Sequence, residues 1–366
     1  MRTGPEFEAR VQRLKRGLEE AGLSGVVVVP GPNMKYFTGV DSLMLERPFM
    51  LLVPTDGEVH LVAPTLESGP YQRSSLRMAI HPWTDSEGPR AAIYSAIRES
   101  GMKGRWGIEG RVPFSYMEKL LEKARIKPAD AEPVLQRLRE TKDGTEVRLL
   151  KEAGAILSRA FEEFPGLLKD GVSELEVAKA ATEVIYSHGA TAVDDMLVQG
   201  GPKAADPHHL PSERKLSHGD SVVMDVGATY KGYYADVTRT FSIGPSQEVE
   251  KTYAKVLEAQ EAAIEAAGAG VRVGAVDSAA RKVLTRAGMG KNFFHRTGHG
   301  LGLEIHEAPY IVEYGKEELG PGMCFTVEPG AYFRGRLGVR IEDDVLIEGK
   351  QGAVITYAPK EYGWWK

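Results

Sequence analysis

Residues 221–242 carry two aspartates, Asp225 and Asp236, among valine, tyrosine and threonine residues. Residues of this kind on both sides of Lys231-Gly232 predict a β-hairpin with a tight turn. A turn at Lys231-Gly232 pairs Asp225 with Thr238, and a turn centred one peptide bond earlier pairs the two aspartates with each other. Because strand side chains alternate with period two, both registers leave the aspartates on one face. Neighbouring carboxylates in apolar surroundings repel each other, so they ionise at low cost only with a cation between them.

Three later residues offer further ligand groups in apolar strand or turn contexts. His299 lies among glycines, which leave room for close backbone approach to something bound. Glu328 follows an apolar run and precedes Pro-Gly, so we expect it at the end of a strand. Glu342 shares a strand face with Arg340, which could simply neutralise it. Each group alone has an ordinary structural explanation, and a common site is favoured because all of them occupy apolar contexts.

The combined set supplies carboxylate oxygens and one imidazole, and its members are Asp225, Asp236, His299, Glu328 and Glu342. This oxygen-rich set favours Mn²⁺, Co²⁺, Fe²⁺ or Zn²⁺ over metals that select thiolate ligands. Two ions about 3.5 Å apart, bridged by shared carboxylates, would balance the negative charges and activate a water between them. The sequence therefore predicts a site for two divalent metal ions.

Short motifs around these groups are Met224-Asp-Val-Gly, Ala235-Asp-Val-Thr-Arg-Thr-Phe, Gly298-His-Gly-Leu-Gly-Leu-Glu-Ile-His-Glu, Val327-Glu-Pro-Gly and Val339-Arg-Ile-Glu-Asp. In this order they resemble the motifs of the pita-bread metallopeptidases, and within that family the proline-specific branch of prolidases and aminopeptidases P. The resemblance covers the chain in full from about Glu140 onward. It extends more weakly to residues 33–39.

The resemblance implies a role for each metal ligand. Asp225 would chelate one metal, Asp236 and Glu342 would bridge both, and His299 and Glu328 would bind the second. The metals implied are two divalent ions per subunit, Mn²⁺ foremost, with Co²⁺, Fe²⁺ or Zn²⁺ as alternatives.

The resemblance also assigns residues to the substrate. His208 matches the family's substrate-side histidine, and His306 the histidine that contacts the reacting carbonyl. Glu328 is the family's candidate for carrying a proton to the proline nitrogen. Arg340 is a candidate for anchoring either a substrate carboxylate or a ligand glutamate. His295 is expected to contact the residues that bind the metals, and not the metals or the substrate.

These expectations identify the chain as a metallopeptidase that hydrolyses the Xaa-Pro bond at the N-terminus of short peptides. An Xaa-Pro dipeptidase (prolidase) is favoured because the chain is short for an aminopeptidase P, which would act on longer peptides. The alternative from another class is a catalytically inert module that binds peptides, and the complete ligand set argues against it. The family implies a homodimer.

Composition limits the other possibilities. The 366 residues suit two domains, and 42% hydrophobic with 27% charged residues is ordinary for a globular protein. A formal net charge of −5 argues against nucleic acid or an acidic membrane as partner. No apolar run is long enough to span a membrane, and the charged N-terminus does not resemble a signal peptide. The lone cysteine, Cys324, fits a reducing compartment, for which the cytoplasm is expected.

The elements that must position the site belong to the second of two predicted domains. Residues 1–132 alternate short strands and helices, which predicts a smaller mixed α/β domain that acts as scaffold, gate and dimer contact. Residues 126–133 contain two prolines and are interpreted as a linker. Residues 133–366 are predicted to be α+β, a pita-bread catalytic domain with helices packed on an antiparallel sheet. Helix starts are expected at Asp143 or Thr145 and at Ser173, where Glu176 completes a capping-box pattern.

Overall fold

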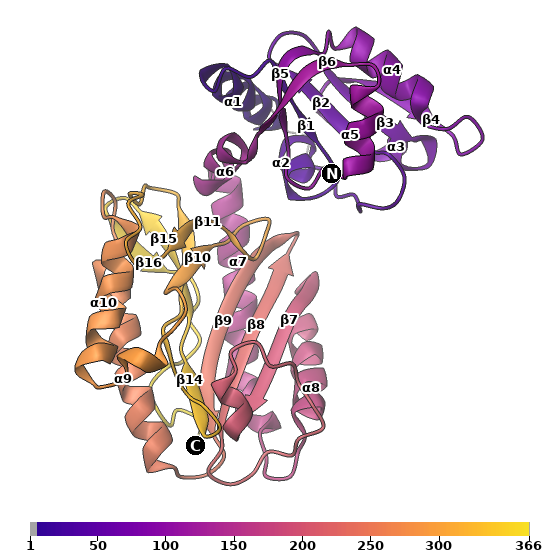
Figure 1. The fold of residues 1–366 in the computed structure, drawn as a ribbon. Helices are drawn as coiled ribbons and strands as arrows, with labels where there is room; N and C mark the ends of the chain where they lie inside the picture. The colour runs from indigo at the N-terminus through magenta and orange to yellow at the C-terminus, as the bar shows by residue number, and fades with distance from the viewer. Residues whose placement is uncertain (1–5, 366) are drawn as a thin grey trace. The chain divides into compact units, whose positions relative to one another are not determined.

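A computed structural model describes residues 6–365, which divide between two compact units (Figure 1). Unit 1 is Met1–Arg139 and unit 2 is Glu140–Lys366, whereas the sequence places the boundary between residues 132 and 133. In the described residues, no helix is long and apolar enough to cross a membrane.

Unit 1 is built on one mixed sheet of order β4-β3-β2-β1-β5-β6. Strands β1, β5 and β6 run parallel to one another, as do β3 and β4, and the remaining pairs are antiparallel. The inner strands β1, β2 and β3 are buried throughout, because their continuous apolar runs pack on both faces. The strands are β1 Gly25–Val28, β2 Met50–Pro54, β3 Val59–Pro64, β4 Met78–Trp83, β5 Lys103–Ile108 and β6 Arg125–Asp130. The helices are α1 Glu6–Glu20, α2 Pro32–Thr38, α3 Thr65–Gln72, α4 Arg90–Glu99, α5 Phe114–Leu121 and α6 Glu132–Glu140.

The predicted linker at residues 126–133 is wrong. That segment forms most of β6 and the start of α6, and β6 pairs with β5 along its whole length. Pro128 is compatible with this strand because β6 lies at the edge of the sheet, where a missing N–H breaks no ladder.

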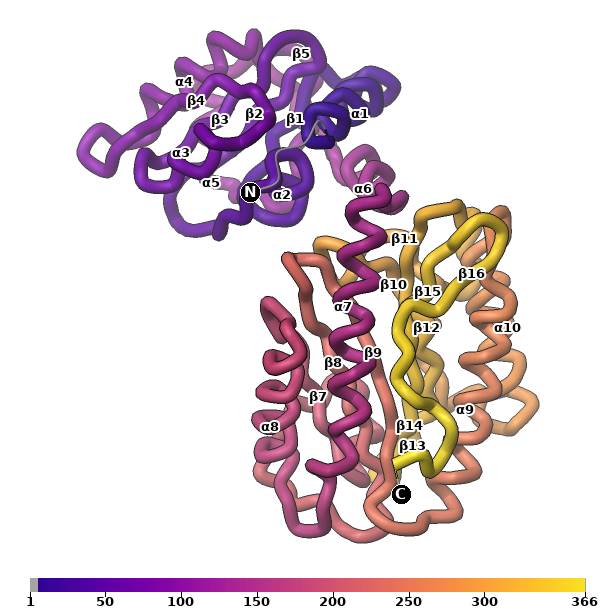
Figure 2. The backbone as a smooth tube through the Cα atoms, turned by 180° about the vertical axis from the view of Figure 1, so that it is seen from behind, coloured from indigo at the N-terminus to yellow at the C-terminus, as the bar shows by residue number. Residues whose placement is uncertain are grey.

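The first half of unit 2 is a three-stranded antiparallel sheet, β7-β8-β9, covered on one face by two helices. Figure 2 shows α7 running along the β8–β9 hairpin. Alternate residues such as Met224 and Val226 of β8 and Val237 of β9 pack into the core with these helices. The opposite face carries the aspartates. The elements are α7 Gly144–Glu163, α8 Glu174–Ser187, β7 Ala192–Gly200, β8 Ser221–Tyr230 and β9 Tyr233–Ser242, with short 3₁₀ turns η1 Phe164–Leu167 and η2 Gly201–Ala205.

The second half of unit 2 packs two helices against shorter strands around a second core. Its strands form a five-stranded sheet, β11-β10-β12-β15-β16, and a β13–β14 ribbon, with every pairing antiparallel. The elements are α9 Gln247–Ala266, α10 Val273–Arg286, η3 Gly290–Asn292, β10 Gly298–Gly300, β11 Glu307–Ile311, β12 Cys324–Val327, β13 Gly330–Phe333, β14 Leu337–Arg340, β15 Asp343–Glu348 and β16 Gln351–Val354.

The predicted fold class is confirmed, and so are both helix starts. Asp143 caps α7 and Ser173 caps α8, each in a complete capping box with the glutamate three residues later. The helices of unit 2 pack on antiparallel sheet, and unit 1 is mixed α/β.

Candidate metal centre

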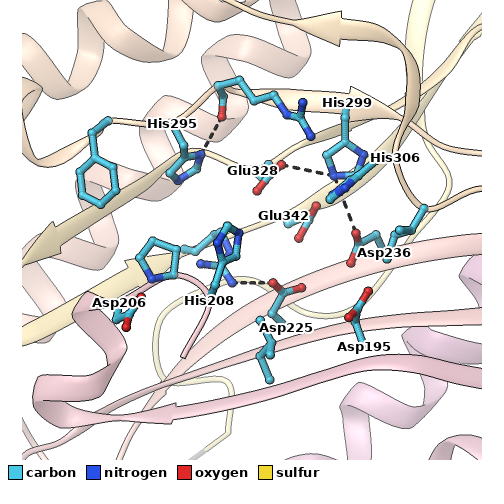
Figure 3. Close-up of a pocket in the computed structure, with 16 residues that line it drawn as sticks. Asp195, Asp206, His208, Asp225, Asp236, His295, His299, His306, Glu328 and Glu342 are labelled. Carbon is cyan, nitrogen blue, oxygen red and sulfur yellow. Dashed lines mark hydrogen bonds and ion pairs between the residues drawn. The ribbon is translucent and has the colours of Figure 1, made fainter. Parts of the chain in front are cut away.

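One pocket of about 620 Å³ in unit 2 brings together every residue that the sequence singles out for the site (Figure 3). Its labelled side chains come from β7, from the loop that follows η2, from the β8–β9 hairpin, and from strands and loops of the second half of unit 2. The predicted residues that line it are His208, Asp225, Asp236, His299, His306, Glu328, Arg340 and Glu342.

The β8–β9 hairpin turns at Lys231-Gly232, and this selects one of the two predicted registers. Both turn residues have positive φ (52° and 81°), the backbone of a two-residue hairpin turn. Asp225 therefore faces Thr238, and Asp236 faces Gly227. The aspartates lie on the same face of the sheet, as both registers predicted.

Glu342 is held against the hairpin by a reciprocal pair of hydrogen bonds. The Thr238 hydroxyl donates to Glu342 Oε2 (2.6 Å), and the Glu342 backbone N–H donates to the Thr238 carbonyl (3.0 Å). Burial raises the pKa of both Glu342 and Asp236, and the neighbouring carboxylates raise it further. The site therefore groups more carboxyl groups than the guanidinium beside them, that of Arg340, can neutralise, so their full ionisation requires a further cation.

His299 presents its Nε2 atom to these carboxylates. Nε2 lies 3.9 Å from Asp236 Oδ2 and 3.5 Å from Glu328 Oε1. The other ring nitrogen, Nδ1, lies 3.1 Å from the Gly300 carbonyl oxygen, which can only accept a hydrogen bond. Nδ1 therefore carries the proton and Nε2 directs its lone pair at the carboxylates. Burial lowers the pKa of His299 to about 3, so the imidazole is neutral and ready to bind a metal.

The glycines next to His299 do not leave room for a ligand, contrary to the interpretation from the sequence. A Cβ on Gly298 would lie 1.8 Å from the Thr326 carbonyl oxygen, and one on Gly300 would lie 2.2 Å from the Ala308 carbonyl oxygen. The glycines are required because the neighbouring strands β12 and β11 approach the backbone of β10 closely.

Glu328 follows β12 directly, at the strand end that the sequence predicts. Its backbone N–H donates to the Thr297 carbonyl (2.8 Å), which fixes Glu328 next to the strand that carries His299. Burial raises the pKa of Glu328 to about 8. In the absence of a cation, this carboxyl keeps a proton near neutral pH.

Two buried oxygens in this cluster have no hydrogen-bond partner among the described residues. They are Asp236 Oδ1 and Glu342 Oε1, and ligand atoms of Asp236, His299 and Glu342 all lie within 4.8 Å of one another. Buried polar atoms are normally satisfied, so each unpaired one requires an explanation. Unpaired carboxylate oxygens beside an imidazole lone pair fit a bound divalent cation in both charge and ligand type.

Arg340 is buried and bonded to an aspartate rather than to Glu342. Its Nη2 donates to Asp225 Oδ2 (2.5 Å), its Nη1 to the Tyr332 hydroxyl (2.9 Å) and its Nε to the Thr238 hydroxyl (3.2 Å). The Tyr332 hydroxyl also lies 3.0 Å from His295 Nε2, whose partner nitrogen faces a backbone carbonyl. This chain of hydrogen bonds fixes the carboxylate of Asp225.

The two histidines predicted on the substrate side border the pocket from different segments. The His306 ring packs edge-on against His299, with 4.1 Å between ring centroids. Burial lowers the pKa of His306, with a further contribution from the charge of Arg296. His208 is exposed in a loop, and the side chain of Gln199 donates to the carbonyls of Pro207 (2.9 Å) and His209 (3.1 Å) on either side of it.

Sequence reasoning missed several residues that shape the pocket. Thr238 could have been found, since it faces Asp225 in one of the predicted registers. Asp195 on β7 and Arg296 beside His299 also line the pocket. Gln199 and Tyr332 gave no sequence signal, because their contacts join segments far apart in the chain.

Models of two known protein families match the chain. The family model described as Creatinase/Prolidase N-terminal domain matches residues 10–141, and the one described as Metallopeptidase family M24 matches residues 148–349. A protein of Mycobacterium tuberculosis named "Probable dipeptidase PepE" is 39% identical over 347 residues, which cover 93% of this chain and 92% of that protein.

Two solved structures match nearly the whole chain. A recombinant prolidase from Thermococcus sibiricus is 38% identical with a TM-score of 0.91, covering 97% of this chain and 98% of that one. An Xaa-Pro dipeptidase from Bacillus anthracis is 32% identical with a TM-score of 0.90, covering 97% of this chain and 99% of that one.

Proposed function

The chain belongs to metallopeptidase family M24, and from this premise we propose that it hydrolyses the Xaa-Pro bond of Xaa-Pro dipeptides. The observation that carries the proposal is the set of unpaired, buried carboxylate oxygens beside the His299 lone pair, at the base of an open pocket. The names of similar proteins, dipeptidase, prolidase and Xaa-Pro dipeptidase, support the choice of substrate.

The metal ligands would be the side chains that the resemblance assigns. Asp225 would hold one ion, His299 and Glu328 the other, and Asp236 and Glu342 would be shared between them. We propose Mn²⁺ as the ion and two ions per chain. When bound, such ions polarise the carbonyl and lower the pKa of a water to near neutrality.

The protein's own groups would orient the peptide and handle its protons. Hydrolysis adds a hydroxyl group to the carbonyl carbon before proline and a proton to the proline nitrogen. His306 and His208, at the open side of the pocket, would donate hydrogen bonds to the carbonyl oxygen as charge develops there. Glu328 would carry the proton to the proline nitrogen. Arg340 would act by positioning Asp225, because three of its N–H groups are already bonded.

The proline substrate fits this arrangement for a chemical reason. An Xaa-Pro bond is a tertiary amide without an N–H. It cannot donate the backbone hydrogen bond with which many peptidases hold an extended substrate. A site that acts directly on the carbonyl does not need that N–H. The free amino group of the substrate would approach Asp225, which would restrict cleavage to the first residue.

The proposal also covers the oligomeric state and the cellular compartment of the enzyme. We propose that it works as a homodimer, which the family resemblance implies, with unit 1 as scaffold, gate and dimer contact. The single buried cysteine, Cys324, is compatible with the reducing cytoplasm as its compartment.

The test compares three peptides, Leu-Pro, Arg-Pro-Pro and Leu-Ala, on purified enzyme treated with EDTA and resupplied with Mn²⁺. We expect cleavage of Leu-Pro that EDTA stops and Mn²⁺ restores, and at least tenfold slower cleavage of Arg-Pro-Pro. Equal rates on Leu-Pro and Arg-Pro-Pro would indicate an aminopeptidase P. Equal rates on Leu-Pro and Leu-Ala would contradict proline specificity. Binding of Leu-Pro without cleavage of any peptide would indicate the inert module.

A further inference from the structure

Asp195 is a carboxylate of the pocket that the proposed chemistry does not use. It lies on β7 opposite Gly227 of β8, and Gly227 in turn lies opposite Asp236 of β9. Asp195 and Asp236 therefore occupy one row across the sheet, on the same face. In Figure 3, Asp195 stands beside Asp225 and Asp236 at the border of the pocket.

Gly227 leaves room for Ile305 beside the Asp195 side chain. A Cβ on Gly227 would lie 3.7 Å from Asp195 Oδ2 and 2.4 Å from Ile305 Cδ1. The missing side chain thus makes room for Ile305, whose Cδ1 covers Gly227 next to the Asp195 carboxylate.

The Asp195 carboxylate makes no hydrogen bond or ion pair with the described residues, and it is exposed to solvent. Its neighbour Asp194 differs, because it accepts a hydrogen bond from the Tyr234 hydroxyl (2.7 Å) and does not line the pocket. The register shift between Val193 and Asp195 accounts for two successive aspartates with separate environments. Asp195 is therefore free to bind a ligand, whereas Asp194 is already engaged.

The position of Asp195 relative to Asp225 suggests which part of a substrate it would meet. Asp225 faces Leu197 on β7, so Asp195 is its diagonal neighbour, roughly 7–8 Å away along the same face. If the substrate's amino group lies at Asp225, the side chain of the first residue can extend past Ile305 toward Asp195. Leu197 and Ile305 line this path and would cover an aliphatic stem.

We propose that Asp195 forms a subsite for a cationic side chain, so that the enzyme prefers dipeptides that begin with lysine or arginine. The long stem of either residue would pack on Leu197 and Ile305 while its charged end reaches Asp195. A glutamate or aspartate in the first position would meet a like charge instead. This inference rests on the proposed function, because it uses the placement of the substrate amino group at Asp225.

The experiment measures kcat/KM of the Mn²⁺-loaded enzyme for Lys-Pro, Leu-Pro and Glu-Pro. We expect the order Lys-Pro, Leu-Pro, Glu-Pro. Asp195→Asn lowers the value for Lys-Pro by roughly three- to tenfold, the effect of one partly screened charge pair, and leaves Leu-Pro within about twofold. Asp195→Lys reverses the order of Lys-Pro and Glu-Pro. Asp194→Asn is the matched control, since it removes the same charge one residue away and should leave the order unchanged.

An equal loss on all three peptides would overturn the inference, because Asp195 would then bind the amino group common to every substrate. Unchanged selectivity in Asp195→Asn would overturn it as well. If the wild-type enzyme cleaves only dipeptides without proline, the proposed function fails, and the same comparison with Lys-Ala, Leu-Ala and Glu-Ala still tests Asp195. Unchanged melting temperatures of the variants show that they are folded.

Discussion

Asp236 and Glu342 are buried carboxylates, each with one oxygen that no described group satisfies. Burial and mutual repulsion raise the pKa of both, so the folded chain without metal stores unfavourable electrostatic energy at this point. A cation bound between the two carboxylates would attract both and outweigh their mutual repulsion. The residues that would bind the metal are therefore expected to reduce the stability of the metal-free protein.

Glu342→Gln is predicted to raise stability and to remove activity. The amide keeps an oxygen that can accept the Thr238 hydrogen bond, and it removes one repelling charge next to Asp236. In EDTA, we expect the melting temperature to rise by roughly 2–4 °C, which corresponds to about 1 kcal/mol in a domain of this size. With Mn²⁺ added, hydrolysis of Leu-Pro should fall by at least about 100-fold. Calorimetry and a peptide assay measure the two effects.

Glu348→Gln is the control, since it makes the same chemical change outside the site, at an exposed carboxylate that ends β15, the strand that follows Glu342. It should leave activity unchanged. Turnover of Leu-Pro by Glu342→Gln at the wild-type rate, with metal supplied, would contradict a site for two shared ions.

Strand β10 shows how an element of three residues can determine the position of a ligand. It lies between β11 and β12, and both neighbours approach its backbone so closely that only glycine fits on either side of His299. His299 cannot shift without moving one of these strands. The position of the imidazole is therefore a property of the packed sheet and not of the histidine alone.

Gly298→Ala is predicted to destabilise unit 2 and to weaken metal binding. Its methyl group would collide with the Thr326 carbonyl, a backbone atom that can move only with β12. Overpacking of this kind costs about 1–3 kcal/mol or more, and it would shift His299 away from Asp236 and Glu328. Chemical denaturation measures the first effect, and Mn²⁺ titration by calorimetry measures the second.

Gly144→Ala provides the comparison, because a Cβ at this first position of α7 would meet nothing within 4 Å. It should leave metal binding unchanged and stability unchanged or slightly higher. A Gly298→Ala protein with wild-type metal affinity would show that β10 does not set the position of His299.

At the scale of the whole molecule, both units carry buried titratable groups whose pKa is shifted. In unit 1, burial lowers the pKa of His60 and His81, whose ring nitrogens lie 3.1 Å apart. In unit 2, burial raises the pKa of Glu328 to about 8 and lowers the pKa of His295 and His299 to about 3. As the pH falls, the carboxyl group therefore adds to the stability of unit 2 and the histidines subtract from it.

Acidification of the metal-free protein from about pH 7.5 to 5.5 is predicted to destabilise unit 1, whereas in unit 2 the proton held by Glu328 offsets part of the loss from the buried histidines. Unfolded histidine binds a proton near pH 6.5, and the buried pair does not, so the stability from this pair is lost as the pH falls below that value. For Glu328 the folded state holds the proton between about pH 8 and 4.5, so its contribution to stability grows as the pH falls through this window. Calorimetry in EDTA at several pH values measures both transitions.

Two variants separate these contributions. His60→Asn combined with His81→Asn should weaken the acid response of unit 1, in which the raised pKa of buried Glu109 acts in the opposite direction. Glu328→Gln should make unit 2 lose more stability on acidification, because it removes the group whose contribution grows as the pH falls. Variants with the same pH dependence as the wild-type protein would contradict this assignment.

The sequence by itself determined the chemistry of the site and most elements that carry it. The alternation of apolar and polar residues placed Asp225 and Asp236 on one face of a hairpin, because strand periodicity is a local property. Local rules also gave the caps at Asp143 and Ser173, since the capping groups lie within three residues of each other.

Only the tertiary structure decided how these groups meet. The register of the hairpin followed from the backbone conformation of the turn at Lys231-Gly232. That Arg340 bonds to Asp225 followed from a contact between residues 115 positions apart in the chain. The glycines beside His299 proved to serve strand packing, and the segment 126–133 proved to complete a sheet. Such outcomes depend on which distant strands pair, and pairing across long separations leaves no periodic signal in one sequence.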